Sequence, residues 1–225
     1  MPAWRVIALP EAIDERTAAA MMVKGLTARN LLKRCYPVRP GDTILVHAAA
    51  GGVGLIMCQW ARHLGATVIG TVGTDAKAET ARAHGCDHTI VYTREDFAAR
   101  VREITAGEGV HAVYDSIGKD TFEDSLSCLR PLGLMAQFGE TSGEPPLVSP
   151  RKLGTLGSIY LTHPSLPHYT ATREDFVASA DDLFEIVASG VVKIEIGHVY
   201  PLAEAAQAHI DMAARRTTGS VVLVP

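Results

Sequence analysis

The chain has 225 residues, of which 47% are hydrophobic and 20% charged, and its formal net charge is -4 at pH 7. These values are typical of a folded globular protein of one large domain, or of one and a half domains of ordinary size. They exclude a disordered chain and give no basic footprint for nucleic acid.

The least charged run, residues 43–62, is interrupted by His47, Gln59 and several small residues, so we expect no membrane span. The N-terminal residues lack the basic-then-apolar order of a signal peptide, which predicts a cytoplasmic protein. The four cysteines are far apart in sequence and form no C-x-x-C pair, so we interpret them as buried thiols and predict no metal site.

In chain order, residues 1–13 contain a short apolar run between two prolines, which predicts a strand or an extended entry. Helix formers fill residues 14–35, with Gly25 as a candidate break between two helices. Pro40 and Gly41 then suit a turn into the first long strand.

Residues 42–54, DTILVHAAAGGVG, predict a buried strand, a tight turn and the start of a helix. Ala49, Gly51 and Gly54 have the spacing of G-x-G-x-x-G with alanine in the first place, a turn that points backbone N–H groups at a pyrophosphate. A turn that binds nothing also favours glycine, so the pattern alone leaves both readings open. The candidate phosphate-binding residues are Ala49, Ala50, Gly51, Gly52, Val53 and Gly54.

Strand and helix patterns then alternate with short links, which predicts an α/β fold with a doubly wound, parallel, six-stranded Rossmann sheet and right-handed crossovers. One helix is expected to begin near Thr93 and Asp96, and residues 119–133 are expected to form a helix and its stop. The six expected strands cover residues 43–46, 66–72, 88–92, 111–118, 134–139 and 157–163.

The last part of the chain predicts a C-terminal α+β segment. Thr172 and Asp175 begin an amphipathic helix, and residues 191–202 alternate as a strand does. Another helix and a terminal strand, residues 218–225, follow. Because six strands already complete the Rossmann sheet, we expect this segment and residues 1–13 to belong to a second sheet whose other strands lie outside the chain.

The end of the second strand indicates the cofactor. Residues 69–74 carry no carboxylate that would bind the ribose hydroxyl of NAD or repel a 2′-phosphate. Lys77 follows four residues after Gly73, at the start of a helix, where its ammonium suits a phosphate. NADP(H) is therefore favoured over NAD(H). Asp75 argues against it unless it is an N-cap, and an ordinary solvated lysine is the alternative reading of Lys77.

Several motifs occur together: HAAAGGVGLIMCQWARHLGATVIGTVGT, VYDSIG, QFGETSG, GSIYLTHPSL and TTGSVVLVP. In this order they resemble the zinc-independent NADPH:quinone oxidoreductases of the medium-chain dehydrogenase/reductase superfamily, of the zeta-crystallin type. The resemblance extends over essentially the whole chain. In that family the turn has the motif A-x-x-G-x-x-G, which corresponds here to Ala48, Gly51 and Gly54.

The resemblance implies a set of cofactor contacts, residue by residue. Gly73, Thr74 and Lys77 would hold the 2′-phosphate, with Tyr92 at the adenosine end. The ribose and nicotinamide would contact Ser116, Ile117, Phe138, Thr141 and Ser142, and Arg215, or its neighbour Arg216, would lie near the cofactor. Strand-end residues such as Ile117 and Phe138 are equally well explained as core. No catalytic residue is identified.

The implied activity is hydride transfer from NADPH to a quinone or related conjugated carbonyl. Family members carry a GroES-like catalytic domain of roughly a hundred residues ahead of this point. Residues 1–25 are then a remnant of that domain, residues 26–163 the Rossmann domain, and residues 164–225 the return segment of an incomplete catalytic domain. The alternatives are a non-catalytic NADP(H)-binding module, or a related alcohol dehydrogenase or enoyl reductase.

The sixth strand, Gly157–His163, leaves an unpaired sheet edge without a blunting charge before His163. Together with the resemblance, this predicts a homodimer paired through that strand. The sequence names no particular acceptor.

Overall fold

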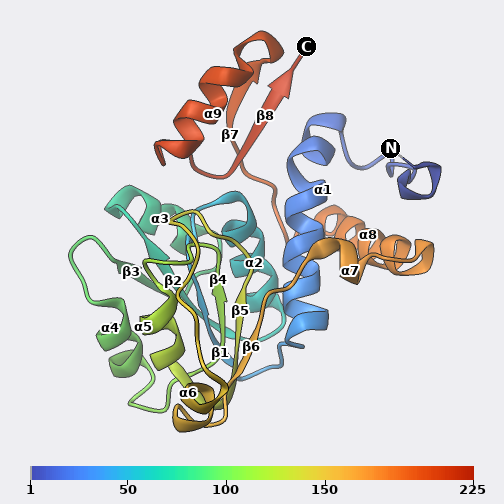
Figure 1. Cartoon of the computed structure of the whole chain (residues 1–225). Coiled ribbons are helices and arrows are strands. Elements are labelled where there is room, and N and C mark those ends of the chain that lie inside the picture. The colour runs from blue at the N-terminus through green and yellow to red at the C-terminus, as the bar shows by residue number, and fades with distance from the viewer. Residues whose placement is uncertain (1) are drawn as a thin grey trace.

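A computed structural model describes residues 2–225 and shows a parallel six-stranded sheet between layers of helices (Figure 1). The strand order β3-β2-β1-β4-β5-β6 is the doubly wound order expected of a dinucleotide-binding fold. The predicted fold class is confirmed. The strands are β1 Thr43–Val46, β2 Thr67–Val72, β3 His88–Val91, β4 Val110–Asp115, β5 Leu129–Gln137 and β6 Tyr160–Thr162.

Both faces of this main sheet are buried, because successive side chains of a strand point to opposite faces. Ile44 and Val46 belong to one buried cluster, and Leu45 between them belongs to the other. Helices α1 Glu15–Asn30, α2 Gly52–His63, α3 Asp75–Ala83 and α8 Arg173–Ala188 contribute to the first cluster. Helices α4 Phe97–Ile104, α5 Phe122–Ser127 and α6 Pro150–Thr155 contribute to the second.

The strand order reverses between β1 and its neighbours. Ile44 pairs with Val68 of β2 on one side and with Ala112 of β4 on the other. In such sheets the crossovers leave in opposite directions, and a crevice opens at the carboxyl ends of the strands. The candidate site must therefore be sought where β1, β2 and β4 end.

Helix starts follow capping chemistry. The Asp14 side chain accepts from Arg16 N and Thr17 N at the start of α1, and Thr172 caps α8 as predicted. The predicted role of Thr93 is wrong. Asp96 caps α4, while the Thr93 hydroxyl donates to the Gly73 carbonyl at 3.2 Å.

The predicted break at Gly25 is also wrong, because α1 passes through it without interruption. Gly25 faces α8, where a Cβ atom would collide with the side chain of Leu183. Packing of two helices, and not a turn, is what this glycine permits. The helix ends in a π-turn, Leu31–Cys35.

The predicted helix and stop at residues 119–133 are partly wrong. Helix α5 ends at Ser127, and β5 already begins at Leu129, which pairs with Val110. The pairing shifts between Val110 and Ala112, and Leu132 has a φ of 62°. A bulge therefore lets a segment with the composition of a turn continue as a strand.

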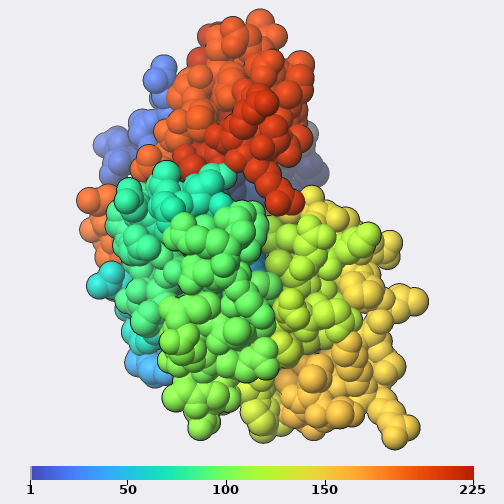
Figure 2. Space-filling view, turned by 90° about the vertical axis from the view of Figure 1, so that its left-hand side faces the viewer, coloured from blue at the N-terminus to red at the C-terminus, as the bar shows by residue number. Residues whose placement is uncertain are grey.

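The C-terminal unit, residues 196–225, has a sheet of its own. Strands β7 Ile196–Pro201 and β8 Ser220–Val224 pair in parallel, and α9 Ala205–Ala213 connects them. Figure 2 shows this unit in orange and red as a lobe against the rest of the molecule. The prediction of a separate sheet is confirmed, although β7 begins later than expected.

Residues 2–13 do not join that sheet. They form a 3-10 turn, Ala3–Arg5, and an irregular segment, so the expected place in the second sheet is wrong for the described residues, and of the two expected forms, a strand or an extended entry, the strand is excluded. The short helix α7 Leu166–Tyr169 and α8 lie beside α1 (Figure 1).

Candidate functional site

The glycine turn follows β1 directly and is tightly folded. Gly51 N donates to the Ala48 carbonyl at 2.9 Å, and Ala48 itself has a φ of 51°. A Cβ at Gly54 would collide with the Ala48 carbonyl and with the Ala49 backbone. Gly54 therefore allows α2 to start directly against the turn, as the spacing predicted.

The N-terminus of α2 has no capping side chain, and Gly51 there forms a parallel bridge with Gly219 of the C-terminal unit. Its N-cap is Gly51, which has no side chain to accept from the first-turn N–H groups, and no acidic residue lies in that turn. Unpaired N–H groups and the helix dipole both favour negative charge. Gly52 and Val53, in the first turn, are half-buried, whereas Ala49 is fully buried beneath the turn.

A cleft of about 560 Å³, called here the main cleft, opens at the strand ends. It joins the glycine turn to the ends of β2, β3 and β4 and to the C-terminal unit. Eight predicted site residues contribute to its wall: Ala50, Gly51, Gly73, Lys77, Tyr92, Ile117, Thr141 and Arg215. Ala48 of the family motif also lines it.

The end of β2 forms the positive part of the main cleft. Thr74 caps α3 by accepting from Lys77 N at 3.3 Å, and Lys77 Nζ donates to the Arg215 carbonyl at 2.8 Å. Burial, and then the neighbouring Arg215, lower the pKa of Lys77. A Cβ at Gly73 would lie 3.0 Å from the Tyr92 hydroxyl, so glycine keeps this corner open.

Asp75 is not the N-cap that the sequence allowed; Thr74 has that role. The Asp75 carboxylate instead binds Arg94, whose two Nη atoms lie 2.7 and 2.5 Å from its oxygens. The hydrogen bond from Arg94 is the main cause that lowers the pKa of Asp75.

A buried polar network that sequence reasoning missed supports the cleft from below. The His47 ring bonds to Thr71 Oγ1 at 2.8 Å and to Ser125 Oγ at 2.9 Å. Ser125 also donates to Asp115, whose other carboxylate oxygen accepts from Ile117 N at 2.7 Å. Burial lowers the pKa of His47, partly offset by Asp115. The network ties three strand ends together and fixes the turn that presents Ile117.

The remaining predicted residues of this turn form side-chain-to-backbone hydrogen bonds. Ser116 offers its carbonyl to the Thr141 hydroxyl at 3.3 Å, and the Ser142 hydroxyl donates to the Ile117 carbonyl at 2.8 Å. Neither serine lines the main cleft; both instead bond to residues that do, Thr141 and Ile117.

A side cavity of about 330 Å³ continues from the main cleft. Tyr92, Ile117 and Arg215 line both spaces. The side cavity adds four acidic side chains to these shared residues: Glu95, Asp96, Asp120 and Asp124.

Phe138 lies at a third space of about 260 Å³, the Phe138 cavity, between the ends of β5 and β6 and helix α1. Thr27, Asn30, His163 and Tyr169 are among its lining residues. His163 bonds to Gln137, the last residue of β5. No local sequence motif predicts that these side chains lie together, because they come from three separate segments of the chain.

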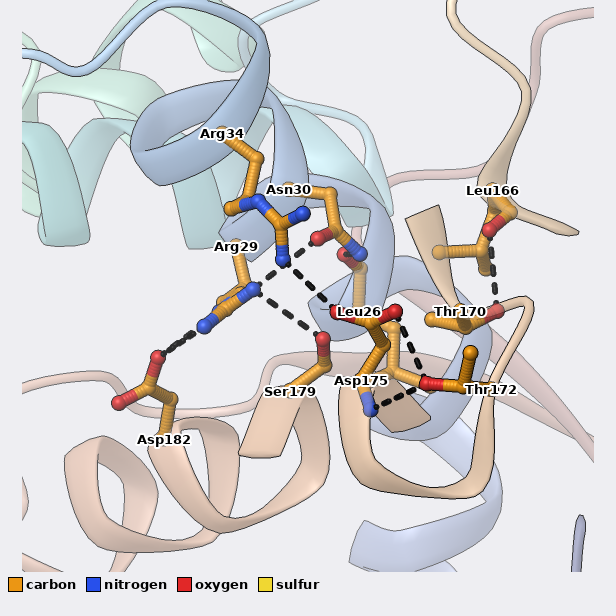
Figure 3. Close-up of polar contacts among 10 residues, drawn as sticks. All are labelled: Leu26, Arg29, Asn30, Arg34, Leu166, Thr170, Thr172, Asp175, Ser179 and Asp182. Carbon is orange, nitrogen blue, oxygen red and sulfur yellow. Dashed lines mark hydrogen bonds and ion pairs between the residues drawn. The ribbon is translucent and has the colours of Figure 1, made fainter. Parts of the chain in front are cut away.

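Figure 3 shows what holds Asn30 at this cavity. Asn30 is 3% exposed; its amide donates to the Leu26 carbonyl, and its oxygen accepts from Arg29 Nη1 at 3.2 Å. Arg29 also donates to Ser179 Oγ and binds Asp182 of α8 at 2.7 Å. An ion pair between α1 and α8 thus orients a polar side chain of the cavity.

The C-terminal unit supplies the part of the main cleft that the sequence did not predict. His209, Met212 and Ala213 of α9, with Thr217 after it, line the wall opposite the glycine turn. Gly219 N donates to the Ala50 carbonyl at 3.1 Å, which joins this wall to the turn.

The described residues, 2–225, contain neither a candidate metal site nor a candidate membrane-spanning helix. No group of three or more His, Cys, Asp or Glu side chains in this range is placed to hold a metal ion. Within the same range, no helix is long and apolar enough to cross a membrane. The four cysteines are free thiols.

Comparison with known proteins gives strong matches. Residues 52–183 match the family described as zinc-binding dehydrogenase. The chain is 51% identical to a 2-haloacrylate reductase of Burkholderia sp over all of its length and 68% of the relative. It is also 51% identical to a quinone oxidoreductase of Pseudomonas aeruginosa, over 98% of this chain and 68% of that protein.

Solved structures agree with these matches. The Escherichia coli quinone oxidoreductase complexed with NADPH has a TM-score of 0.93 and 47% identity, over 97% of this chain and 68% of that one. A mycobacterial protein complexed with NADPH has a TM-score of 0.97 and 49% identity, over 100% of this chain and 69% of that one. The chain thus spans about two thirds of the length of these proteins.

Proposed function

We propose, from the premise that the chain belongs to the quinone oxidoreductases of the medium-chain dehydrogenase/reductase superfamily, that it binds NADPH in the main cleft for hydride transfer to quinones or related conjugated carbonyls. One observation carries the choice of NADPH. Lys77 lies beside Gly73 at the end of β2, and no carboxylate among residues 2–225 is paired with its ammonium.

Two parts of the main cleft suit the pyrophosphate and the 2′-phosphate of this cofactor. The pyrophosphate is proposed to lie on the N–H groups of Gly52 and Val53, at the uncapped end of α2. The 2′-phosphate is proposed to lie between Gly73, Lys77 and Arg215, where the missing Cβ of Gly73 leaves room.

The rest of the cofactor follows from the neighbouring spaces. The adenosine is proposed to extend past Tyr92 and Ile117 into the side cavity. The nicotinamide is proposed to extend past Thr141 toward Phe138, three residues along the same loop, and so toward the Phe138 cavity. Thr74, Ser116 and Ser142 are proposed to support this arrangement through the side-chain-to-backbone hydrogen bonds already described.

When bound, NADPH supplies the hydride from C4 of its nicotinamide. The protein is proposed to bind the cofactor and the acceptor, to orient them toward each other, and to exclude water from the reacting face. The Phe138 cavity combines apolar residues such as Leu31 and Leu166 with polar groups on Thr27, Asn30, His163 and Tyr169, which suit a carbonyl-bearing acceptor. The related proteins named for quinones and for 2-haloacrylate indicate the same acceptor chemistry: a carbonyl conjugated to an electron-poor double bond.

We also propose that the C-terminal unit belongs to a second, catalytic domain. Its sheet has only two strands, and Val199, Leu202 and Leu223 are exposed on it. Residues 164–195, in contrast, pack with the main sheet through Phe176 and Leu183 of α8. The boundary of the second domain is therefore proposed at residue 196, not 164. The boundary expected at residue 25 falls inside α1 and is proposed to move ahead of that helix.

The assembly proposed is a homodimer joined through β6, the free edge of the main sheet. Tyr160 on this strand is 59% exposed, as a strand awaiting a partner permits. Light scattering should give the mass of two chains, and the mass of one chain would contradict the proposal. The proposed location is the cytoplasm, where the free thiols of the four cysteines would stay reduced.

Substitution of Lys77 by alanine tests the cofactor assignment. Wild type should bind NADPH more tightly than NADH in a calorimetric titration. We expect K77A to lose about tenfold or more in NADPH affinity, since a charge-assisted hydrogen bond contributes roughly 1.5–3 kcal/mol, with NADH affinity changed by less than about twofold. The matched control is K152A, a lysine of α6 that pairs with Glu123 outside the cleft, and it should behave as wild type.

Absence of NADPH binding, or tighter binding of NADH by wild type, would overturn the assignment. Turnover then separates the enzyme from the non-catalytic module. We expect oxidation of NADPH in the presence of a small panel of quinones. Cofactor binding without any turnover would support the alternative, an NADP(H)-binding module.

A further inference from the structure

Asp75 places a carboxylate next to the proposed 2′-phosphate site. It is the first residue of α3, directly after the N-cap Thr74 and two residues before Lys77. The helix dipole favours an anion in the first turn, and although Asp75 does not line the main cleft, its charge two residues from Lys77 would repel a phosphate held there. An uncompensated carboxylate there would select against the phosphorylated cofactor.

Arg94 compensates this carboxylate with good geometry. Its two Nη atoms donate to the two oxygens of Asp75 at 2.7 and 2.5 Å. Bidentate pairing fixes direction as well as distance. Both side chains are more than half exposed, so the pair contributes little to folding, and its charge balance is the more informative property.

The backbone around Arg94 is tied to the same corner of the cleft. Arg94 N donates to the Val91 carbonyl at 3.0 Å. The preceding residue, Thr93, bonds to the Gly73 carbonyl at 3.2 Å, and Val91 N donates to Glu95 at 2.9 Å. The turn after β3 therefore holds the guanidinium at a defined place beside α3.

The cations at this corner divide into two kinds. Arg94 is matched by Asp75, whereas neither Lys77 nor Arg215 pairs with a carboxylate in residues 2–225. The positive charges of Lys77 and Arg215 are available to a phosphate as long as Arg94 neutralises the negative charge of Asp75. Without Arg94, the Asp75 carboxylate would be unpaired at the start of the helix that carries Lys77.

We propose that Arg94 is a specificity-determining residue that favours NADPH over NADH by neutralising Asp75, without contacting the cofactor. This inference rests on the proposed function. It assigns to Arg94 an indirect role, unlike Lys77 and Arg215, which are proposed to meet the phosphate.

The experiment is a double-mutant cycle read by cofactor affinity. The full chain is prepared as wild type, R94A, D75N and R94A/D75N, and each is titrated with NADPH and with NADH by calorimetry. R94A should weaken NADPH about fivefold, the size of one like-charge contact near a protein surface, with NADH changed by less than about twofold. R94A/D75N should return NADPH affinity to within about twofold of wild type, because the repelling carboxylate is gone.

Two controls sharpen the cycle. R82A removes a neighbouring cation of α3 that forms no hydrogen bond with Asp75, and it should change NADPH affinity by less than about twofold. The R94A defect should also shrink at high salt, because salt screens repulsion between exposed charges.

Three outcomes would overturn the inference. A double variant as weak as R94A would mean that Arg94 contacts the phosphate or holds the turn. Equal loss of NADPH and NADH affinity would mean a general loosening of the site, and unchanged NADPH affinity in R94A would mean that Asp75 has no influence. Failure of wild type to bind NADPH at all is a different result, because it overturns the proposed function itself.

Discussion

The main sheet and the C-terminal unit are both built from parallel strands, yet they differ in how completely they are buried. In the main sheet, Ile44, Leu45 and Met135 are fully buried between helices on two faces. In the C-terminal unit, Val199 of β7 is 47% and Leu223 of β8 is 37% exposed. A parallel sheet normally has both faces covered, so the smaller sheet is the one that lacks neighbours.

The difference has a consequence for the cleft. The main sheet supplies the glycine turn and Lys77, whereas the C-terminal unit supplies Arg215 and the wall at Met212. The two regions are joined where Gly219 N donates to Ala50 and where Lys77 Nζ donates to Arg215. The wall of the cleft with the glycine turn and Lys77 is thus part of the main sheet and its buried core. The opposite wall belongs to the C-terminal unit, whose sheet has only two strands.

The largest effect on stability and cofactor binding is expected at Gly54, in the glycine turn that follows β1 of the main sheet. Gly54→Val should destabilise the chain by about 3 kcal/mol and abolish NADPH binding, because the new side chain collides with backbone that cannot move aside. Gly154→Ala is the matched control: it lies in exposed α6 with open space around it. The control should stabilise by about 0.5–1 kcal/mol. Urea unfolding and a cofactor titration measure both, and a stable, NADPH-binding G54V would show that the turn tolerates a side chain.

This glycine is also where sequence reasoning succeeded, because the information is local. The apolar run at Ile44, the spacing of Gly51 and Gly54, and the place of Lys77 lie within one βαβ unit, so pattern and turn chemistry determine them together. Buried strands and tight turns restrict which residues are allowed at each position.

Sequence reasoning failed where distant segments meet. His209 and Met212 reach the main cleft only through the packing of the C-terminal unit, which no local pattern encodes. Gly25 was misread as a helix break because its reason lies in Leu183, a residue of another helix. Leu129 was assigned to a helix stop because its neighbours favour turns, while its pairing with Val110 decides the strand.

An intermediate effect is expected at the contact between α1 and α8. Arg29 is 8% exposed, and R29M would leave Ser179 and Asn30 without their donor and Asp182 with Lys33 alone. We expect a loss of about 2–3 kcal/mol, less than for a fully buried pair, because Asp182 is partly solvated. Equilibrium unfolding in urea measures it.

The control for this contact is R34M, which breaks the exposed Arg34–Asp175 pair and should cost about 0.5 kcal/mol or less. Acid should reduce the difference between wild type and R29M to the part that the hydrogen bonds to Ser179 and Asn30 contribute. Burial acts to raise the pKa of Asp182, but hydrogen bonds from Lys33 and Arg29 lower it overall. The pair therefore stabilises fully above the ordinary pKa of 3.8, and its contribution is lost as the pH falls through the lowered value. A difference of unchanged size at low pH would show that the ion pair with Asp182 contributes nothing to stability.

The smallest effect is expected in the C-terminal unit, and it tests the comparison directly. Leu202→Ser with Ile210→Ser should change the free energy of unfolding by less than about 0.5 kcal/mol, because both side chains are already in water. Leu183→Ala, at a fully buried position of α8, should cost about 3 kcal/mol. If a second copy of the chain covered this exposed face, the unfolding midpoint would rise less steeply with protein concentration in the double serine variant than in wild type. An equal dependence on concentration in the two proteins, which the dimer proposed through β6 would also give, would leave this face free for the catalytic domain proposed to cover it.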